Sequence, residues 1–267
     1  MPPSDANPSL AEELRVLHWN IHSWLDPTGA VNFDAVLQLI RESNPDVVSL
    51  VEVDETWGKP SLLVELAGRT GYASVFAPIF EYGSASPTGG FGNALLSRLP
   101  LQAVIQRQLT WPTTVYNRTE PSEPRAVVLA QLRLPAGGTT YIGSTHLPSK
   151  DAAARTAGLQ RLRSIANGLA GPWLISGDFN TPASDWLDAA DELVLAPDPG
   201  ISTYPTSKPD IAIDYAIASS GSQARAEVLP VHGSDHLPVL ITWQPPATGT
   251  VQTTDLLAEM DRALSSE

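Results

Sequence analysis

The chain has 267 residues, a formal net charge of −13 and no cysteine. The missing cysteines exclude disulfides, thiolate chemistry and cysteine-type zinc sites. The negative charge argues against tight nonspecific binding to long nucleic acids, because such binding depends on clustered Lys and Arg side chains.

The composition is that of one folded domain. A hydrophobic content of 42% supports a sizeable core, and no composition break or internal repeat divides the chain. We expect the domain over residues 14–243, with terminal extensions at 1–13 and 244–267. The first extension has no basic residue and no signal-like apolar run, and no run approaches a membrane span. We therefore expect a cytoplasmic protein without a transmembrane segment.

Apolar runs and alternating patterns predict a strand-rich α/β protein. The expected strands are Leu14–Asn20, Asp46–Val53, Gly92–Ser97, Arg125–Leu134, Thr140–Leu147, Pro172–Ser176, Ile211–Ala218 and Leu237–Trp243. Helical periodicity predicts helices at Phe33–Glu42, Ser61–Arg69, Asp151–Leu169 and, in the C-terminal extension, Asp255–Leu264. Long Pro- and Gly-rich loops are expected at Pro78–Gly90, Thr110–Pro124 and Pro197–Pro209.

The tetrapeptide Gly177-Asp178-Phe179-Asn180 follows an expected strand. In an extended chain, positions i and i+2 share a face, so the side chains of Asp178 and Asn180 would converge on one small ligand. An Asx turn is the alternative interpretation of this spacing.

Polar residues also interrupt four other apolar strands. Asn20, Glu52, His146 and Asp214 each occur in or at the end of such a run. Each one alone has an ordinary explanation, such as a turn, a solvent-facing strand end, a hydrogen-bonded core histidine or an ion pair. Together they suggest a shared site, because strand ends of a sheet can converge on one pocket.

The segment Gly233-Ser234-Asp235-His236 precedes the last expected strand. Adjacent Ser, Asp and His residues cannot form a linear catalytic triad, and the chain has no zinc-protease, Walker A or dinucleotide-binding motif. The remaining oxygen donors are Glu52, Asp178, Asn180, Asn20 and Asp235. This donor set suits Mg²⁺ or Mn²⁺ better than Zn²⁺, and phosphoester hydrolysis is the natural inference.

In order and spacing, these residues resemble the endonuclease/exonuclease/phosphatase superfamily, which has the deoxyribonuclease I-like fold. The phrases Pro45-Asp-Val-Val-Ser-Leu-Val-Glu52 and Gly92-Asn-Ala-Leu-Leu-Ser-Arg98 are similar to that superfamily's as well. The resemblance covers roughly residues 14–243. It implies a four-layer sandwich, in which two mainly antiparallel β-sheets pack face to face with helices on the outside.

The resemblance also implies a metal site. Glu52 would be the principal metal-binding carboxylate, Asn20 would contact the metal's water shell or the phosphate, and Asp235 would join the metal shell. His146 would donate to a nonbridging phosphate oxygen. Arg125 could reach the substrate phosphate, or it could be a surface charge at a strand edge.

The catalytic residues implied by the resemblance are Asp178, Asn180, His146, His236 and Asp214. Asp178 and Asn180 would orient the attacking water, and Asp214 would fix the tautomer of His236. Either Asp178 or His236 could take the water's proton.

We therefore expect a Mg²⁺- or Mn²⁺-dependent phosphodiesterase or phosphatase that acts on a small or lipid-derived phosphoester. The alternatives are an endonuclease or DNA-repair phosphodiesterase, and a binding module of the same fold without activity.

Overall fold

A computed structural model describes residues 13–55, 61–81, 89–110, 123–135, 137–187, 194–197 and 201–246. Its strands are β1 Leu14–Asn20, β2 Val47–Glu55, β3 Ala73–Glu81, β4 Gly90–Ser97, β5 Leu101–Thr110, β6 Arg125–Arg133, β7 Thr139–His146, β8 Trp173–Asp178, β9 Val194–Ala196, β10 Asp214–Ala218, β11 Gln223–Val228 and β12 Val239–Gln244. Its helices are α1 Phe33–Ser43, α2 Leu62–Thr70 and α3 Ala152–Asn167, with short 3-10 turns η1 His22–Trp24 and η2 Ala183–Asp185. The expected helix Asp255–Leu264 lies outside the described residues.

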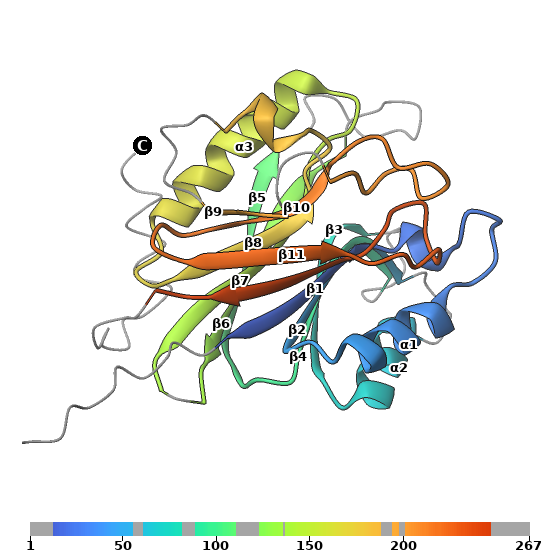
Figure 1. Cartoon of the computed structure of the whole chain (residues 1–267), viewed down its shortest axis with the longest axis horizontal. Helices are drawn as coiled ribbons and strands as arrows, with labels where there is room; N and C mark the ends of the chain where they lie inside the picture. Colours follow the sequence, from blue (N-terminus) through green and yellow to red (C-terminus); the bar gives the residue numbers. More distant parts are fainter. Residues whose placement is uncertain are drawn as a thin grey trace, which may run out of the picture.

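The strands form two six-stranded sheets with the orders β11-β12-β1-β2-β4-β3 and β5-β6-β7-β8-β10-β9. Helices α1 and α2 lie on the outer side of the first sheet, and α3 lies on the outer side of the second, as Figure 1 shows. The expected four-layer sandwich is therefore confirmed.

Three layers of apolar contacts hold the four layers together. The middle one lies between the sheets and includes Val16, Leu95, Val128 and Leu174, all buried. The other two lie under the helices, where the apolar faces of the helices pack on the sheets. Burial of these faces removes apolar area from water, which is the main favourable contribution to folding.

Local sequence signals begin two of the helices. The side chain of Ser61 accepts a hydrogen bond from the backbone N–H of Val64, and Asp151 accepts one from Ala154. Both are N-caps, which satisfy an N–H group that has no partner within the helix.

Each sheet contains one parallel pair of neighbouring strands. β1 pairs in parallel with β2, and β7 pairs in parallel with β8, whereas all other pairings are antiparallel. The chain crosses between the members of each pair through a helix, α1 in the first sheet and α3 in the second. The carboxyl ends of the two strands in each pair therefore lie side by side.

All of the expected strands exist, but the prediction omitted β3, β5, β9 and β11. The loop expected at Pro78–Gly90 was partly wrong, since β3 continues to Glu81 and β4 begins at Gly90. Likewise, Thr110 belongs to β5 rather than to a loop. The strand expected from Ile211 begins only at Asp214. Within the first two expected loops, residues 82–88 and 111–122 lie outside the described residues.

No helix among the described residues has both the length and the apolar character needed to span a bilayer.

Candidate active site

The candidate site lies where the carboxyl ends of the two parallel strand pairs meet. Asn20 ends β1, Glu52 lies near the end of β2, and His146 and Asp178 end β7 and β8. Asp178 is paired in register with His146 and with Asp214, the first residue of β10. The sheet topology thus brings together residues that are far apart in the sequence.

These strand ends border a cavity of about 530 Å³. Its walls carry every predicted site residue except the buried Asn20 and Asp214, which lie directly behind its lining. The lining residues are His22, Ser23, Glu52, Phe91, Glu123, Arg125, His146, Ser149, Asp178, Asn180, Tyr204, Ile213, Asp235 and His236.

Glu52 is directed into this cavity by an irregularity in its strand. The pairing of β2 with β4 shifts register between Leu50 and Val53, and Glu52 has a φ of 56°. This left-handed conformation is strained for a residue other than glycine and is typical of functional positions. Burial raises the pKa of Glu52, and the hydrogen bond from Asn20 opposes that shift. Within the part of the chain that the structure describes, no cationic side chain forms an ion pair with Glu52, and such a partly buried carboxylate is a good candidate ligand for a metal ion.

Asn20 connects the two sheets at the site. Its Nδ2 donates to Glu52 Oε1 and to Asp178 Oδ2, both at 3.1 Å. Its Oδ1 accepts the backbone N–H of His22 at 3.1 Å. The amide therefore presents N–H groups toward the carboxylates.

Both features expected from the tetrapeptide around Asp178 are present, the Asx turn and the convergence of the Asp178 and Asn180 side chains. Asp178 Oδ1 accepts the backbone N–H of Asn180 at 2.9 Å, which is the Asx turn, and Asn180 has a φ of 52°. Yet Asp178 Oδ2 and Asn180 Nδ2 both approach His146 Nε2, at 3.5 Å and 3.0 Å. The expected convergence is present, although a left-handed turn produces it instead of extended backbone.

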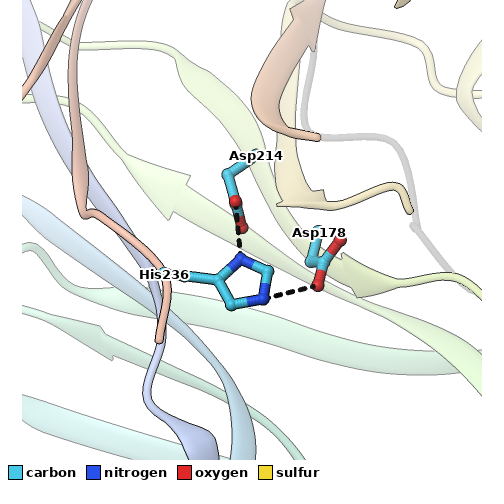
Figure 2. Close-up of side chains that lie close together, drawn as sticks. All are labelled: Asp178, Asp214 and His236. Carbon is cyan, nitrogen blue, oxygen red and sulfur yellow. Dashed lines mark hydrogen bonds and ion pairs between the residues drawn. The ribbon is translucent and has the colours of Figure 1, made fainter. Parts of the chain in front are cut away.

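His236 lies between two carboxylates, as Figure 2 shows. Its Nδ1 is 2.7 Å from Asp214 Oδ2, and its Nε2 is 3.7 Å from Asp178 Oδ2. Burial alone would lower the pKa of His236, but the charges of Asp214 and Asp178 raise it to about 10. Burial likewise opposes ionisation of Asp214, yet His236 and His18 hold the pKa of Asp214 below its usual value.

The environment of Asp178 shifts its pKa upward, in the direction opposite to the shift of Asp214. Its burial and the nearby charge of Asp214 raise its pKa to about 7, although His236 opposes the shift. Two neighbouring carboxylates thus differ in proton affinity, a pattern that is typical of acid–base sites.

His146 is held by Arg125. Arg125 Nη1 donates to His146 Nδ1 at 3.1 Å, which places the proton of the neutral imidazole on Nε2. Burial and the positive charge of Arg125 hold the pKa of His146 well below its usual value, so the ring is neutral. Arg125 is only 6% exposed and pairs with Glu123 at 3.0 Å, so its interpretation as a surface charge at a strand edge is wrong.

Asp235 lies at the cavity wall and is about one-third exposed, with its Oδ1 at 3.9 Å from His22 Nδ1. Its segment is anchored to β1: Ser234 Oγ donates to the carbonyl of Asn20 at 2.7 Å, and Trp19 Nε1 donates to the carbonyl of His236 at 2.9 Å.

Four of the described residues at the site were not predicted from the sequence. Thr203 donates to Asp214 Oδ2 at 2.6 Å, the ring of Tyr204 lies 4.6 Å from that of His236, Glu123 pairs with Arg125, and His18 contacts Asp214. His18 was detectable, because it shares a strand face with Asn20 two residues later. Thr203, Tyr204 and Glu123 lie outside regular elements, where no periodic pattern exists.

Two groups of acidic residues could hold a cation. Asp178, Asp214 and His236 each offer a ligand atom within 4.8 Å of the others. However, His236 Nδ1 is already bonded to Asp214, and a protonated imidazole has no lone pair for a metal. Glu52 and Asp235 also face the cavity, and among the described residues neither forms an ion pair with Arg or Lys, so they suit a hard cation better.

Structural comparison places this chain among related folds. It resembles an endonuclease/exonuclease/phosphatase from Beutenbergia cavernae, with 22% identity, a TM-score of 0.71 and coverage of 90% of this chain and 73% of the other. A mannosyl-6-phosphatase from Bacteroides thetaiotaomicron is 14% identical, with a TM-score of 0.68 and coverage of 86% and 99%. The human Nocturnin catalytic domain with bound sulfate is 22% identical, with a TM-score of 0.64 and coverage of 90% and 99%.

A search of curated proteins gave no match to this chain. The model of the endonuclease/exonuclease/phosphatase family matches residues 17–236. Members of that family are generally phosphoester hydrolases. The chain therefore belongs to the endonuclease/exonuclease/phosphatase family.

Proposed function

We propose that this protein is a divalent-metal-dependent hydrolase of phosphoester bonds, acting on a small or lipid-derived phosphoester. One observation carries the proposal. Carboxylates suited to a metal ion and N–H donors suited to a phosphate line the same cavity, although they come from both sheets.

The donor set supports Mg²⁺ or Mn²⁺ as the metal. Glu52 would be the principal ligand, with Asp235 as a further oxygen ligand and Asn20 bonded to the metal's water shell or the phosphate. The raised pKa of Glu52 reflects a buried negative charge that a cation would stabilise. When bound, the ion supplies Lewis acidity and neutralises charge on the phosphate.

N–H groups that line the cavity from the second sheet would bind the phosphate. His146 and Asn180 line the cavity side by side, with His146 Nε2 at 3.0 Å from Asn180 Nδ2, which itself donates to the carbonyl of Leu147, so His146 Nε2–H is the better donor for an oxygen of the substrate. Arg125 adds a fixed positive charge behind His146, and its buried Nε has no hydrogen-bond partner among the described residues. These groups would hold nonbridging oxygens and stabilise the charge that develops on them.

Asp178 and His236 would carry the proton transfers. A water oriented by Asp178 and Asn180 would attack phosphorus and lose its proton to Asp178, while the bond from phosphorus to the leaving oxygen breaks and the protonated His236 gives its Nε2 proton to that oxygen. Asp178 is the better acceptor, because His236 lies between two carboxylates and is held in its protonated form. Asp214 fixes the ring of His236 through Nδ1.

The dimensions and charge of the molecule favour a small substrate. A cavity of about 530 Å³ is in the range of small-molecule sites. The net charge of −13 disfavours the alternative of a nuclease that binds long nucleic acids.

The proposal is tested with metal-free protein and a panel of substrates. The panel holds a p-nitrophenyl phosphomonoester, a bis-p-nitrophenyl phosphodiester, sphingomyelin, and nicked and abasic DNA, each with Mg²⁺ or Mn²⁺. We expect hydrolysis of a small or lipid ester that EDTA abolishes. Glu52→Gln should lower kcat/KM at least about 100-fold, since a metal ligand contributes several kcal/mol.

Glu65→Gln is the matched control, because Glu65 is exposed on α2, its side chain pairs with Arg69, and it is not one of the residues that line the cavity. It should retain wild-type activity. Activity that survives EDTA and Glu52→Gln would overturn the proposal. Cleavage of the DNA substrates alone would favour the nuclease alternative. A protein that hydrolyses no substrate and does not bind Mg²⁺ or Mn²⁺ would favour the binding module.

A further inference from the structure

A buried histidine that the proposed reaction does not use lies behind the pair of His236 and Asp214. The side chains of His18 and Asp214 are both 0% exposed. His18 Nε2 lies 3.4 Å from Asp214 Oδ1, whereas His236 contacts the other oxygen, Oδ2. Asp214 therefore lies between two imidazole rings.

The contact between His18 and Asp214 satisfies two atoms that are otherwise unpaired. His18 Nε2 and Asp214 Oδ1 are buried, and in the described part of the chain neither has a hydrogen-bond partner at standard geometry. An unpaired buried polar atom costs about 1–3 kcal/mol, so these two atoms are best accommodated by facing each other. Ser49 Oγ donates to Ser144 Oγ, so His18 Nδ1 donates to Ser49, and a ring that also carries a proton on Nε2 points that N–H group at Asp214 Oδ1.

This contact restrains the one free rotation of the Asp214 carboxylate. Thr203 Oγ1 donates to Oδ2 at 2.6 Å, and His236 Nδ1 contacts the same oxygen at 2.7 Å. Both of these hydrogen bonds restrain Oδ2. They leave the position of Oδ1, and so the tilt of the carboxylate plane, without a restraint of its own. His18 holds the second oxygen and so defines the plane in which His236 is aligned.

The position of His18 is itself fixed by a polar chain between the two sheets. Its Nδ1 is 3.2 Å from Ser49 Oγ, its neighbour in register on β2, and Ser49 Oγ is 2.8 Å from Ser144 Oγ on β7. All three side chains are fully buried. A satisfied buried network of this kind is rigid.

We propose that His18 is a positioning residue for the hydrolysis of phosphoesters, which orients Asp214 and through it aligns His236. This inference rests on the proposed function. His18 does not line the cavity, so it acts only through Asp214.

Three variants separate positioning from a structural role. His18→Leu removes both ring nitrogens at similar volume. His18→Gln keeps an N–H donor that can reach Asp214. Ser144→Ala removes the far end of the polar chain and leaves the contact between His18 and Asp214 in place.

The first measurement is steady-state kinetics with the best substrate of the panel. His18→Leu should lower kcat about 10- to 100-fold with KM within about twofold, the usual scale for a residue that orients a catalytic group. His18→Gln should recover most of kcat. Ser144→Ala should lower the unfolding midpoint in urea while kcat stays within about twofold. Wild-type kcat in His18→Leu, or an equal loss of kcat in Ser144→Ala, would overturn the inference.

The second measurement does not need activity. In metal-free protein labelled with ¹⁵N-histidine, the Nδ1–H proton of His236 should give a downfield resonance, because it is bonded to a buried carboxylate. We expect this resonance to broaden or shift upfield in His18→Leu and to persist in Ser144→Ala. An unchanged resonance in His18→Leu would overturn the inference, whereas a wild-type protein inactive on the whole panel would overturn only the proposed function.

Discussion

Asp178 is the residue at which burial and charge act most strongly together. It is almost fully buried, lies near the ionised Asp214, and accepts hydrogen bonds from Asn20 and from the backbone of Asn180. Burial and the negative charge of Asp214 outweigh the attraction of His236, so the neutral form of Asp178 is favoured at higher pH than in a free carboxyl group.

This environment predicts an aspartate in the metal-free protein that titrates near neutral pH. Asp178 should be protonated below a pKa of about 7 and ionised above it. ¹³C NMR of the carboxyl carbons of labelled aspartate measures this directly, and Asp178→Asn assigns the resonance by its loss. Added Mg²⁺ should move the titration to lower pH, because a cation favours the ionised form. A protein in which every aspartate titrates below pH 5, about a unit above the usual value, would contradict this account.

The sequence predicted which side chains come together at the site, but it did not predict the backbone conformation and the buried contacts that position them. Asn20, Glu52, His146, Asp178 and His236 were inferred from polar interruptions and family order, and they do meet. The bulge that turns Glu52 into the cavity has no sequence signal, since Val51, Glu52 and Val53 are an ordinary strand sequence. The contact of His18 with Asp214 crosses two sheets, and periodicity within one strand carries no information about it.

The close approach of strands β7 and β8 depends on a glycine, Gly177. A Cβ atom on Gly177 would lie 2.2 Å from the backbone oxygen of Thr145 on the neighbouring strand, far inside van der Waals contact. Gly177 precedes Asp178 and is paired in register with Thr145. The absence of a side chain at Gly177 therefore allows β7 and β8 to carry His146 and Asp178 side by side.

We predict that Gly177→Ala destabilises the protein by about 1–3 kcal/mol, because the backbone has to move to relieve the overlap. It should also lower activity, since the shift displaces Asp178. Gly68→Ala is the matched control: Gly68 lies in α2, and an added Cβ would meet nothing within 4 Å. That substitution should leave activity unchanged and stabilise the protein by about 0.5–1 kcal/mol. Urea unfolding of both variants measures the difference, and equal stabilities would refute the close approach.

The strands that the sequence revealed are the interior ones. Every omitted strand, β3, β5, β9 and β11, lies at an edge of its sheet. Edge strands carry polar residues and proline, which protect them from pairing with other chains and weaken the apolar pattern. Gln223–Val228, for example, alternates between exposed and half-buried side chains with no buried position.

At the scale of the whole molecule, the site depends on two similar halves. Each sheet contributes one parallel pair joined by a helix, and the four carboxyl ends meet at the same end of the sandwich. The sequence predicted the sandwich only through the order of family motifs, because hydrophobic patterns do not specify which strands are neighbours. The pairing of sheets positions Glu52 from one half opposite Asp178 from the other, bridged by Asn20.

We propose that these distant segments together form one site for a divalent ion. Calorimetric titration of metal-free protein with Mn²⁺ detects such a site, with the wild type, Glu52→Gln and the control Glu65→Gln compared at one pH. We expect one binding event in the wild type and in Glu65→Gln, weakened at least about 10-fold by Glu52→Gln. Mn²⁺ binding that Glu52→Gln leaves unchanged, or no binding to the wild type, would exclude a metal site at Glu52.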